Sequence, residues 1–129
     1  MVVLRRFIQV ALILYWIFAL TMTHIPHPPP LGPVTSDKVA HFLGYGMLTG
    51  LLFLALWFSR PNMRYLPLIV LGIVMAYGAF DELTQPFFHR DCEFGDWLAD
   101  SAAAIVAVSI LGLIRRFIKP PIAPTSDVR

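Results

Sequence analysis

Charged residues and cysteine are scarce in this sequence. Only 14% of its 129 residues are Asp, Glu, Lys or Arg, whereas 57% are hydrophobic. A water-soluble protein of this length cannot bury so much apolar side chain in one core, so the composition excludes an ordinary soluble domain. The single cysteine, Cys92, excludes an intramolecular disulfide bond and leaves the redox compartment undetermined.

The hydrophobic residues fall into four blocks that carry very little charge. These blocks are residues 7–25, 38–58, 65–85 and 97–117. Each is about 20 residues long, which is enough for a helix to cross the roughly 30 Å hydrocarbon core of a bilayer. We therefore predict an all-α, polytopic membrane protein in which residues 1–129 form one domain, a bundle of four transmembrane helices. The tail at 118–129 is predicted to be disordered.

A cleaved signal peptide is the alternative interpretation of the first block, because Arg5 and Arg6 precede it. However, the apolar run is long, and the segment MTHIPHPPP that ends it contains no small-residue cleavage site. The first block is therefore predicted to remain as a transmembrane helix.

Lys and Arg are rare on one side of the predicted bundle. If the helices alternate in direction, this side carries only Lys38 and Arg90. The other side carries Arg5, Arg6, Arg60, Arg64, Arg115, Arg116, Lys119 and Arg129. Because basic loops stay in the cytoplasm, we predict that both termini are cytoplasmic and that the segments around 24–37 and 86–96 face outwards. The pI near 9.0 reflects these basic flanks beside anionic lipid and does not indicate nucleic-acid binding.

The carboxylates gather at the outer ends of the last three predicted helices. Seven of the eight lie there or in the adjoining loop: Asp37, Asp81, Glu82, Asp91, Glu93, Asp96 and Asp100. Glu82, Asp100 and His41 lie about one helical turn inside their helices, where exposure of a charge to lipid costs up to about 2.5–3.5 kcal/mol. Mutual pairing or a water-filled pocket is less costly, so we predict a polar funnel between these three helices.

Helical spacing arranges the candidate residues into stripes, because residues three or four apart share a helix face. The stripes are Asp37–His41–Tyr45, Glu82–Gln85 and Asp96–Asp100. Small residues also recur at four-residue steps, at Gly46 and Gly50, at Gly72 and Ala76, and at Ala99, Ala103 and Ala107. Such steps favour close helix packing in lipid, although small residues are common in all membrane helices.

The connecting segments contain few candidate residues. Thr35 or Ser36 is predicted to cap the second helix, and Pro86 to end the third. The proline-rich loop is predicted to be an extended spacer in which His24 and His27 lie at the surface.

The charged stripes of the last three predicted helices resemble the motifs of the VanZ-like membrane protein family. This family is named for an accessory protein in resistance to the glycopeptide teicoplanin. The matching motifs are Asp37-Lys38-x-x-His41-Phe42 followed by Tyr45, then Glu82-x-x-Gln85, Arg90 and Asp96. The resemblance covers about residues 35–107 and implies a small helical membrane protein. Many members carry an Asn four residues after the last Asp, whereas this chain has Asp100 followed by SAAA, which adds a negative charge to the site.

Together, the stripes and the resemblance give a candidate ligand-binding set. It comprises Asp37, Lys38, His41, Tyr45, Glu82, Gln85, Arg90, Asp96 and Asp100. We expect an outward-facing site for an envelope lipid, a lipid-linked cell-wall precursor or a glycopeptide-like antibiotic. Arg90 and Lys38 would hold a phosphate or carboxylate. No cofactor or metal is expected: a divalent metal held by these carboxylates is an alternative under the enzyme interpretation below, but no HExxH or His-rich spacing supports it.

Three other functions are considered. The first is transport, which is disfavoured because four short helices without a broken segment at the midplane do not resemble a transporter. The chain would be a membrane-embedded enzyme acting on a lipid-linked phosphate at the outer leaflet if His41 and Glu82 formed an acid–base pair. Alternatively, the charged residues would form an ion network that only fixes helix register, although buried charges are an expensive means of assembly. The sequence identifies no catalytic residue and leaves homo-oligomerisation open.

Overall fold

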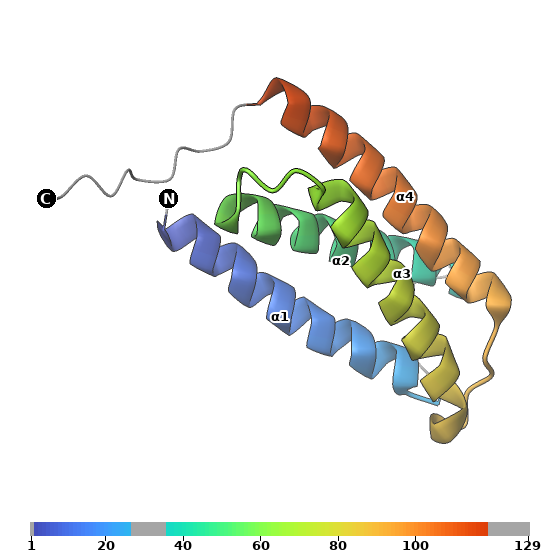
Figure 1. Ribbon diagram of the computed structural model, residues 1–129. Helices are drawn as coiled ribbons and strands as arrows, with labels where there is room; N and C mark the ends of the chain where they lie inside the picture. The colour runs from blue at the N-terminus through green and yellow to red at the C-terminus, as the bar shows by residue number, and fades with distance from the viewer. Residues whose placement is uncertain (1, 27–35, 119–129) are drawn as a thin grey trace, which may run out of the picture.

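The computed structural model describes residues 2–26 and 36–118, and these segments contain helices and turns but no strand. The elements are α1 (Val2–His24), α2 (Asp37–Ser59), α3 (Leu66–Thr84), the 3₁₀ helix η1 (Gln85–Phe88) and α4 (Phe94–Phe117). Four helical segments, with η1 continuing α3, are long and apolar enough to cross a membrane, which confirms the predicted fold class. The start of α1, the α2–α3 link and the end of α4 lie at one end of the bundle, and η1 lies at the other (Figure 1).

The helix ends follow the local sequence signals. The Ser36 side chain accepts a hydrogen bond from the Val39 backbone N–H and so caps α2, as predicted. α3 ends at Thr84, and the chain continues directly as η1. Pro86 lies in the first turn of η1, where its missing N–H is tolerated. α1 begins at Val2, earlier than predicted, because arginine is a good helix former and the helix continues beyond its apolar block.

Some predictions fall on parts of the chain that the structure leaves undescribed. Thr35, His27 and most of the proline-rich loop lie outside the described residues. The predicted disordered tail also lies outside them, apart from its first residue, Ile118.

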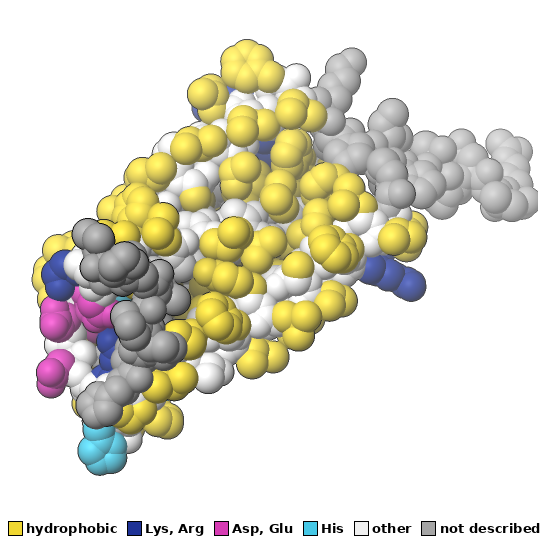
Figure 2. Space-filling model, turned by 180° about the vertical axis from the view of Figure 1, so that it is seen from behind, with side chains coloured by type: hydrophobic (Ala, Val, Ile, Leu, Met, Phe, Trp, Pro, Cys, Tyr) yellow, Lys and Arg dark blue, Asp and Glu magenta, His cyan; other side chains and the backbone are white. Residues whose placement is uncertain are grey.

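α2 lies at the centre of the bundle. It packs most extensively on α4, and it also contacts α1 and α3. The core between these helices contains the completely buried side chains of Leu48, Phe53, Leu66 and Val70. α1 buries only Ile8 and therefore lies at the periphery. Hydrophobic side chains cover most of the length of the molecule in Figure 2, as expected of a surface that faces lipid.

Only some of the small-residue steps mark helix contacts. A Cβ at Gly46 would lie 3.9 Å from the Cβ of Ala103, so α2 and α4 pack closely at this level. A Cβ at Gly50 or Gly72 would meet nothing within 4 Å. Two crossing helices are closest at one level, so one glycine of a GxxxG pair can lie at the contact while the other does not.

Candidate functional site

Polar side chains meet at the end of the bundle that contains η1. The residues that define this buried polar cluster are each at most 5% exposed: His41, Tyr45, Asp81, Glu82, Gln85, Asp96 and Asp100. They come from the first turns of α2 and α4 and from the end of α3 together with η1. Asp and Glu side chains are visible at this end in Figure 2. The predicted convergence of polar side chains is therefore present in the structure.

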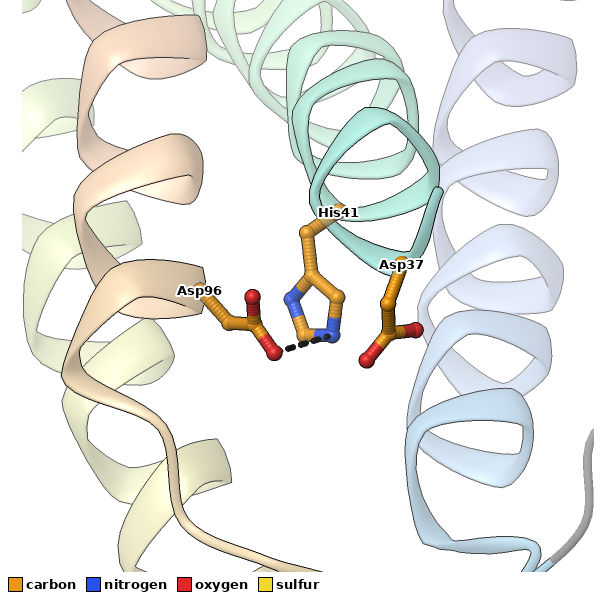
Figure 3. A group of neighbouring side chains, drawn as sticks. All are labelled: Asp37, His41 and Asp96. Carbon is orange, nitrogen blue, oxygen red and sulfur yellow. Dashed lines mark ion pairs between the residues drawn. The ribbon is translucent and has the colours of Figure 1, made fainter. Parts of the chain in front are cut away.

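His41 lies at the centre of the cluster. Its Nδ1 lies 3.0 Å from Asp100 Oδ1 and 3.9 Å from Glu82 Oε1, and its Nε2 lies 3.9 Å from Asp96 Oδ2. In Figure 3, His41 and Asp37 on α2 lie beside Asp96 on α4. Carboxylates from two other helices thus converge on one imidazole of α2.

Glu82 is held by hydrogen bonds from both sides. The Gln85 side-chain amide donates to Glu82 Oε1 at 3.2 Å, and the Glu93 backbone N–H donates to Oε2 at 3.0 Å. Because Gln85 begins η1 and Glu93 immediately precedes α4, Glu82 links the two ends of this connection. The predicted Glu82–Gln85 stripe is therefore part of the cluster.

Asp81 belongs to the cluster but was not among the candidate residues. It is completely buried; Tyr45 Oη donates to its Oδ2 at 3.0 Å, and Thr23 Oγ1 of α1 donates to its Oδ1 at 2.8 Å. Asp81 lies four residues before Gln85, so helical spacing allowed it to share the face of the Glu82–Gln85 stripe, but spacing does not show which neighbour covers it. Packing of α1 against this side buries Asp81 as well.

His24, predicted to lie at the surface, instead ends α1 against α3. Its Nε2 lies 2.9 Å from Thr84 Oγ1, and its Nδ1 lies 3.6 Å from Asp81 Oδ1. α1 therefore forms part of the site, which sequence analysis had confined to the other three helices. No sequence signal identified the contribution of α1, because His24 lies where an apolar block meets a proline-rich segment.

Lys38 and Arg90 lie where the cluster meets the surface of the bundle, a region called its mouth below. Both residues have acidic partners. Lys38, 54% exposed, donates to Glu93 at 2.7 Å and to Asp96 at 3.0 Å. The Arg90 side chain, 12% exposed, donates to Asp37 and to the Thr23 backbone oxygen, both at 3.2 Å. Arg90 therefore ties the segment before α4 to both α1 and α2.

A comparison with protein families places the chain in a family. The family model described as VanZ/LLP1 matches residues 4–115, from the first turn of α1 to the last turns of α4. The chain belongs to the VanZ/LLP1 family. This confirms the resemblance indicated by the motifs of α2, α3 and α4. No curated protein and no solved structure matches the VanZ/LLP1 chain described here.

The buried cluster of this VanZ/LLP1 protein is rich in negative charge. Among the described residues, no Lys or Arg forms an ion pair with Asp81, Glu82 or Asp100. Within this cluster, two buried oxygens, Asp100 Oδ2 and Gln85 Oε1, also lack a hydrogen-bond donor among the described residues. Burial of such groups is costly, so the interior favours a cation, whereas an anion is favoured only at the mouth.

The opposite end of the bundle has a different chemistry. A surface groove there is lined by Arg64, Pro67, Gly112, Arg115 and Arg116. Arg115 donates to the backbone oxygens of Pro61 and Met63 and so fixes the end of α4 to the α2–α3 link. The described basic residues of this end have no acidic partner among the described residues, whereas Lys38 and Arg90 do.

Proposed function

We propose that this VanZ/LLP1 protein is a multi-pass protein of the bacterial cytoplasmic membrane. At the outer mouth of its polar cluster it binds the anionic group of an amphipathic envelope molecule. A phosphate or carboxylate is shared by envelope lipids, lipid-linked cell-wall precursors and glycopeptide-like molecules. One observation carries the proposal: both cations, Lys38 and Arg90, lie where polar side chains of all four helices converge.

The two exposed acidic partners of these cations, Asp37 and Glu93, are displaceable. Asp37 and Glu93 are about half exposed, so they can return to water at little cost. A phosphate or carboxylate would replace them, and the planar guanidinium of Arg90 would bind it through two parallel N–H groups. The buried Asp96 would remain on Lys38 and keep the ammonium group at the mouth.

The surroundings of the mouth suit an amphipathic ligand. Phe87 of η1 and Phe94 at the start of α4 expose large aromatic side chains at the same end of the bundle as the charged residues. Such rings are favoured where a membrane meets water. An anionic headgroup at Lys38 and Arg90 would therefore place its hydrocarbon portion against these side chains and the apolar outer surface of the bundle.

An enzyme is the second candidate function, because His41 and Asp100 form a close imidazole–carboxylate pair of the kind used by general bases. However, His41 is only 5% exposed, which favours binding at the mouth over chemistry at the imidazole. Turnover of a lipid phosphate by the purified protein, lost in Glu82→Gln, would instead support the enzyme.

Native mass spectrometry of the detergent-solubilised protein tests the binding proposal. We expect a co-purifying anionic amphiphile on the wild-type protein that is lost in Arg90→Ala. Arg60→Ala is the matched control, since it removes an exposed arginine at the opposite end of the bundle. Arg90→Lys retains the positive charge but not the planar guanidinium group, so it should keep part of the bound amphiphile.

A cell-based measurement complements the native mass spectrometry. If the protein confers reduced glycopeptide susceptibility on a host, Arg90→Ala should abolish that effect at equal membrane expression. Equal adduct and equal susceptibility in the Arg90→Ala and Arg60→Ala proteins would refute the proposal.

A further inference from the structure

Three metal-ligand side chains from three helices lie together inside the polar cluster. They are His41 of α2, Glu82 of α3 and Asp100 of α4, which are 5%, 3% and 1% exposed. One ligand atom from each lies within 4.8 Å of the other two. We infer that these three residues form a binding site for one divalent transition-metal ion, Mn²⁺ or Zn²⁺. The inference goes beyond the proposed ligand at the mouth and does not depend on it.

Charge supports a divalent ion at this position. Glu82 and Asp100 are buried, and among the described residues neither forms an ion pair with Lys or Arg. Two carboxylates, a neutral imidazole and one divalent ion sum to zero charge, which suits a site one turn inside a membrane-spanning bundle. The ion would thereby balance two buried carboxylates that have only the His41 imidazole as an ion-pair partner among the described residues.

The geometry is close to that of a metal site. Around an ion with ligand distances near 2.1 Å, neighbouring ligand atoms lie roughly 3.4 Å apart. The distances from His41 Nδ1 to Asp100 Oδ1 and Glu82 Oε1, 3.0 Å and 3.9 Å, bracket this value. His41 Nε2 faces Asp96 Oδ2 at 3.9 Å, and a carboxylate behind the second ring nitrogen is typical of metal-binding histidines.

Two buried oxygens provide independent support. Asp100 Oδ2 has no hydrogen-bond donor among the described residues, although Asp100 is almost completely buried. Gln85 Oε1 also has none, and the amide nitrogen of the same side chain contacts Glu82 Oε1. A buried carboxylate or carboxamide oxygen normally has a donor or a metal. These unpartnered acceptors therefore indicate that the group of His41, Glu82 and Asp100, called the inner group below, binds a cation.

A second group of ligand-type side chains, Asp37, His41 and Asp96, shares the imidazole and lies nearer the mouth (Figure 3). Its carboxylates already have cationic partners, since Asp37 contacts Arg90 and Asp96 contacts Lys38. A metal ion would have to displace both. The inner group has no such competitor, so the inference is confined to it. A mixed set of imidazole and carboxylate suits Mn²⁺ or Zn²⁺ better than Mg²⁺.

Metal titration of delipidated full-length protein tests the inference. After EDTA treatment and buffer exchange, we expect the wild-type protein to bind one Mn²⁺ or Zn²⁺ per chain by calorimetry and to gain thermal stability. Glu82→Gln and Asp100→Asn should abolish stoichiometric binding. Asp91→Asn, which removes an exposed acid at the same end, is the matched control and should bind as wild type.

Two further readouts separate ligation from a structural role. Asp100→Asn keeps an acceptor oxygen for His41 Nδ1 and removes one of two like charges, so it should lose the metal-dependent stabilisation while its metal-free stability is retained or raised. Pulsed EPR of the Mn²⁺-loaded protein should show ¹⁴N coupling from an imidazole, lost in His41→Gln. Asp96→Asn should retain one site with affinity weakened roughly 10- to 100-fold.

Three results would overturn the inference. They are the absence of binding by the wild-type protein, equal affinity in Asp100→Asn and Asp91→Asn, and a loss confined to Asp37→Asn, which would place the ion in the outer group. Retention of metal binding in Arg90→Ala is expected. A failure of the envelope-ligand proposal is therefore distinguishable from a failure of this one.

Discussion

Single residues of the buried cluster are satisfied in different ways. Asp96 has the ammonium group of Lys38, whereas Asp81 has two hydroxyl donors from separate helices. A hydroxyl donor keeps a buried carboxylate hydrogen-bonded without neutralising its charge. The stability of the bundle therefore depends on uncharged neighbours such as Tyr45 and Thr23, and not only on ion pairs.

Removal of the Tyr45 hydroxyl tests this dependence. Tyr45→Phe keeps the ring but leaves Asp81 Oδ2 without a donor, so we expect a loss of roughly 1–3 kcal/mol in the free energy of unfolding. Denaturant titration in detergent micelles measures it. Tyr65→Phe, which alters an exposed tyrosine at the other end of the bundle, should change stability little. Equal effects of the two substitutions would contradict the role of the buried hydroxyl.

At the scale of helices, α2 organises the site because it contacts each of the other three. Its first turns carry Lys38 and His41, and its close approach to α4 at Gly46 brings Asp96 and Asp100 beside them. A larger side chain at this level would separate the two helices and also the acidic and basic groups. Helix packing and site geometry are therefore linked.

Substitutions of the two α2 glycines test this link. Gly46→Leu would force its side chain against Ala103, and overpacking of this kind typically costs about 1–3 kcal/mol. Gly50→Leu introduces the same side chain one turn deeper, where a Cβ meets nothing within 4 Å. Thermal unfolding in micelles should show a lower midpoint for Gly46→Leu alone. A lower midpoint for Gly50→Leu alone would show that the close contact between α2 and α4 is not at Gly46.

At the scale of the whole molecule, the two ends differ in the balance of charge. The end with η1 contains the buried carboxylates, and the opposite end exposes arginines without acidic partners among the described residues. The helices alternate in direction, so the α2–α3 link lies with the start of α1 (Figure 1). With basic residues retained in the cytoplasm, the acidic end is predicted to face outwards.

The single cysteine provides a test of this orientation. Cys92 is exposed and lies between η1 and α4. A membrane-impermeant maleimide should therefore label it in intact cells. In a Cys92→Ser, Asn62→Cys protein, the thiol lies in the link between α2 and α3, and labelling should require permeabilisation. The reverse pattern would invert the predicted topology and place the polar mouth in the cytoplasm.

Several features of this protein followed from the sequence by itself. Four long apolar blocks require membrane-spanning helices, because a bilayer offers no other partner for their backbone groups. Three- and four-residue spacing then placed His41 with Asp37, and Asp96 with Asp100, on common helix faces. These are local properties of a helix, so they do not depend on how the helices pack.

The tertiary structure alone decided which faces meet. Burial of Asp81 required α1 to pack beside α3, and the pairing of Arg90 with Asp37 and Thr23 required the η1 connection to fold back over two helices. Side-chain spacing within a helix contains no information on crossing angles or on which helices become neighbours. The partners of the buried charges depend on long-range packing, and that packing also brings His41, Glu82 and Asp100 together.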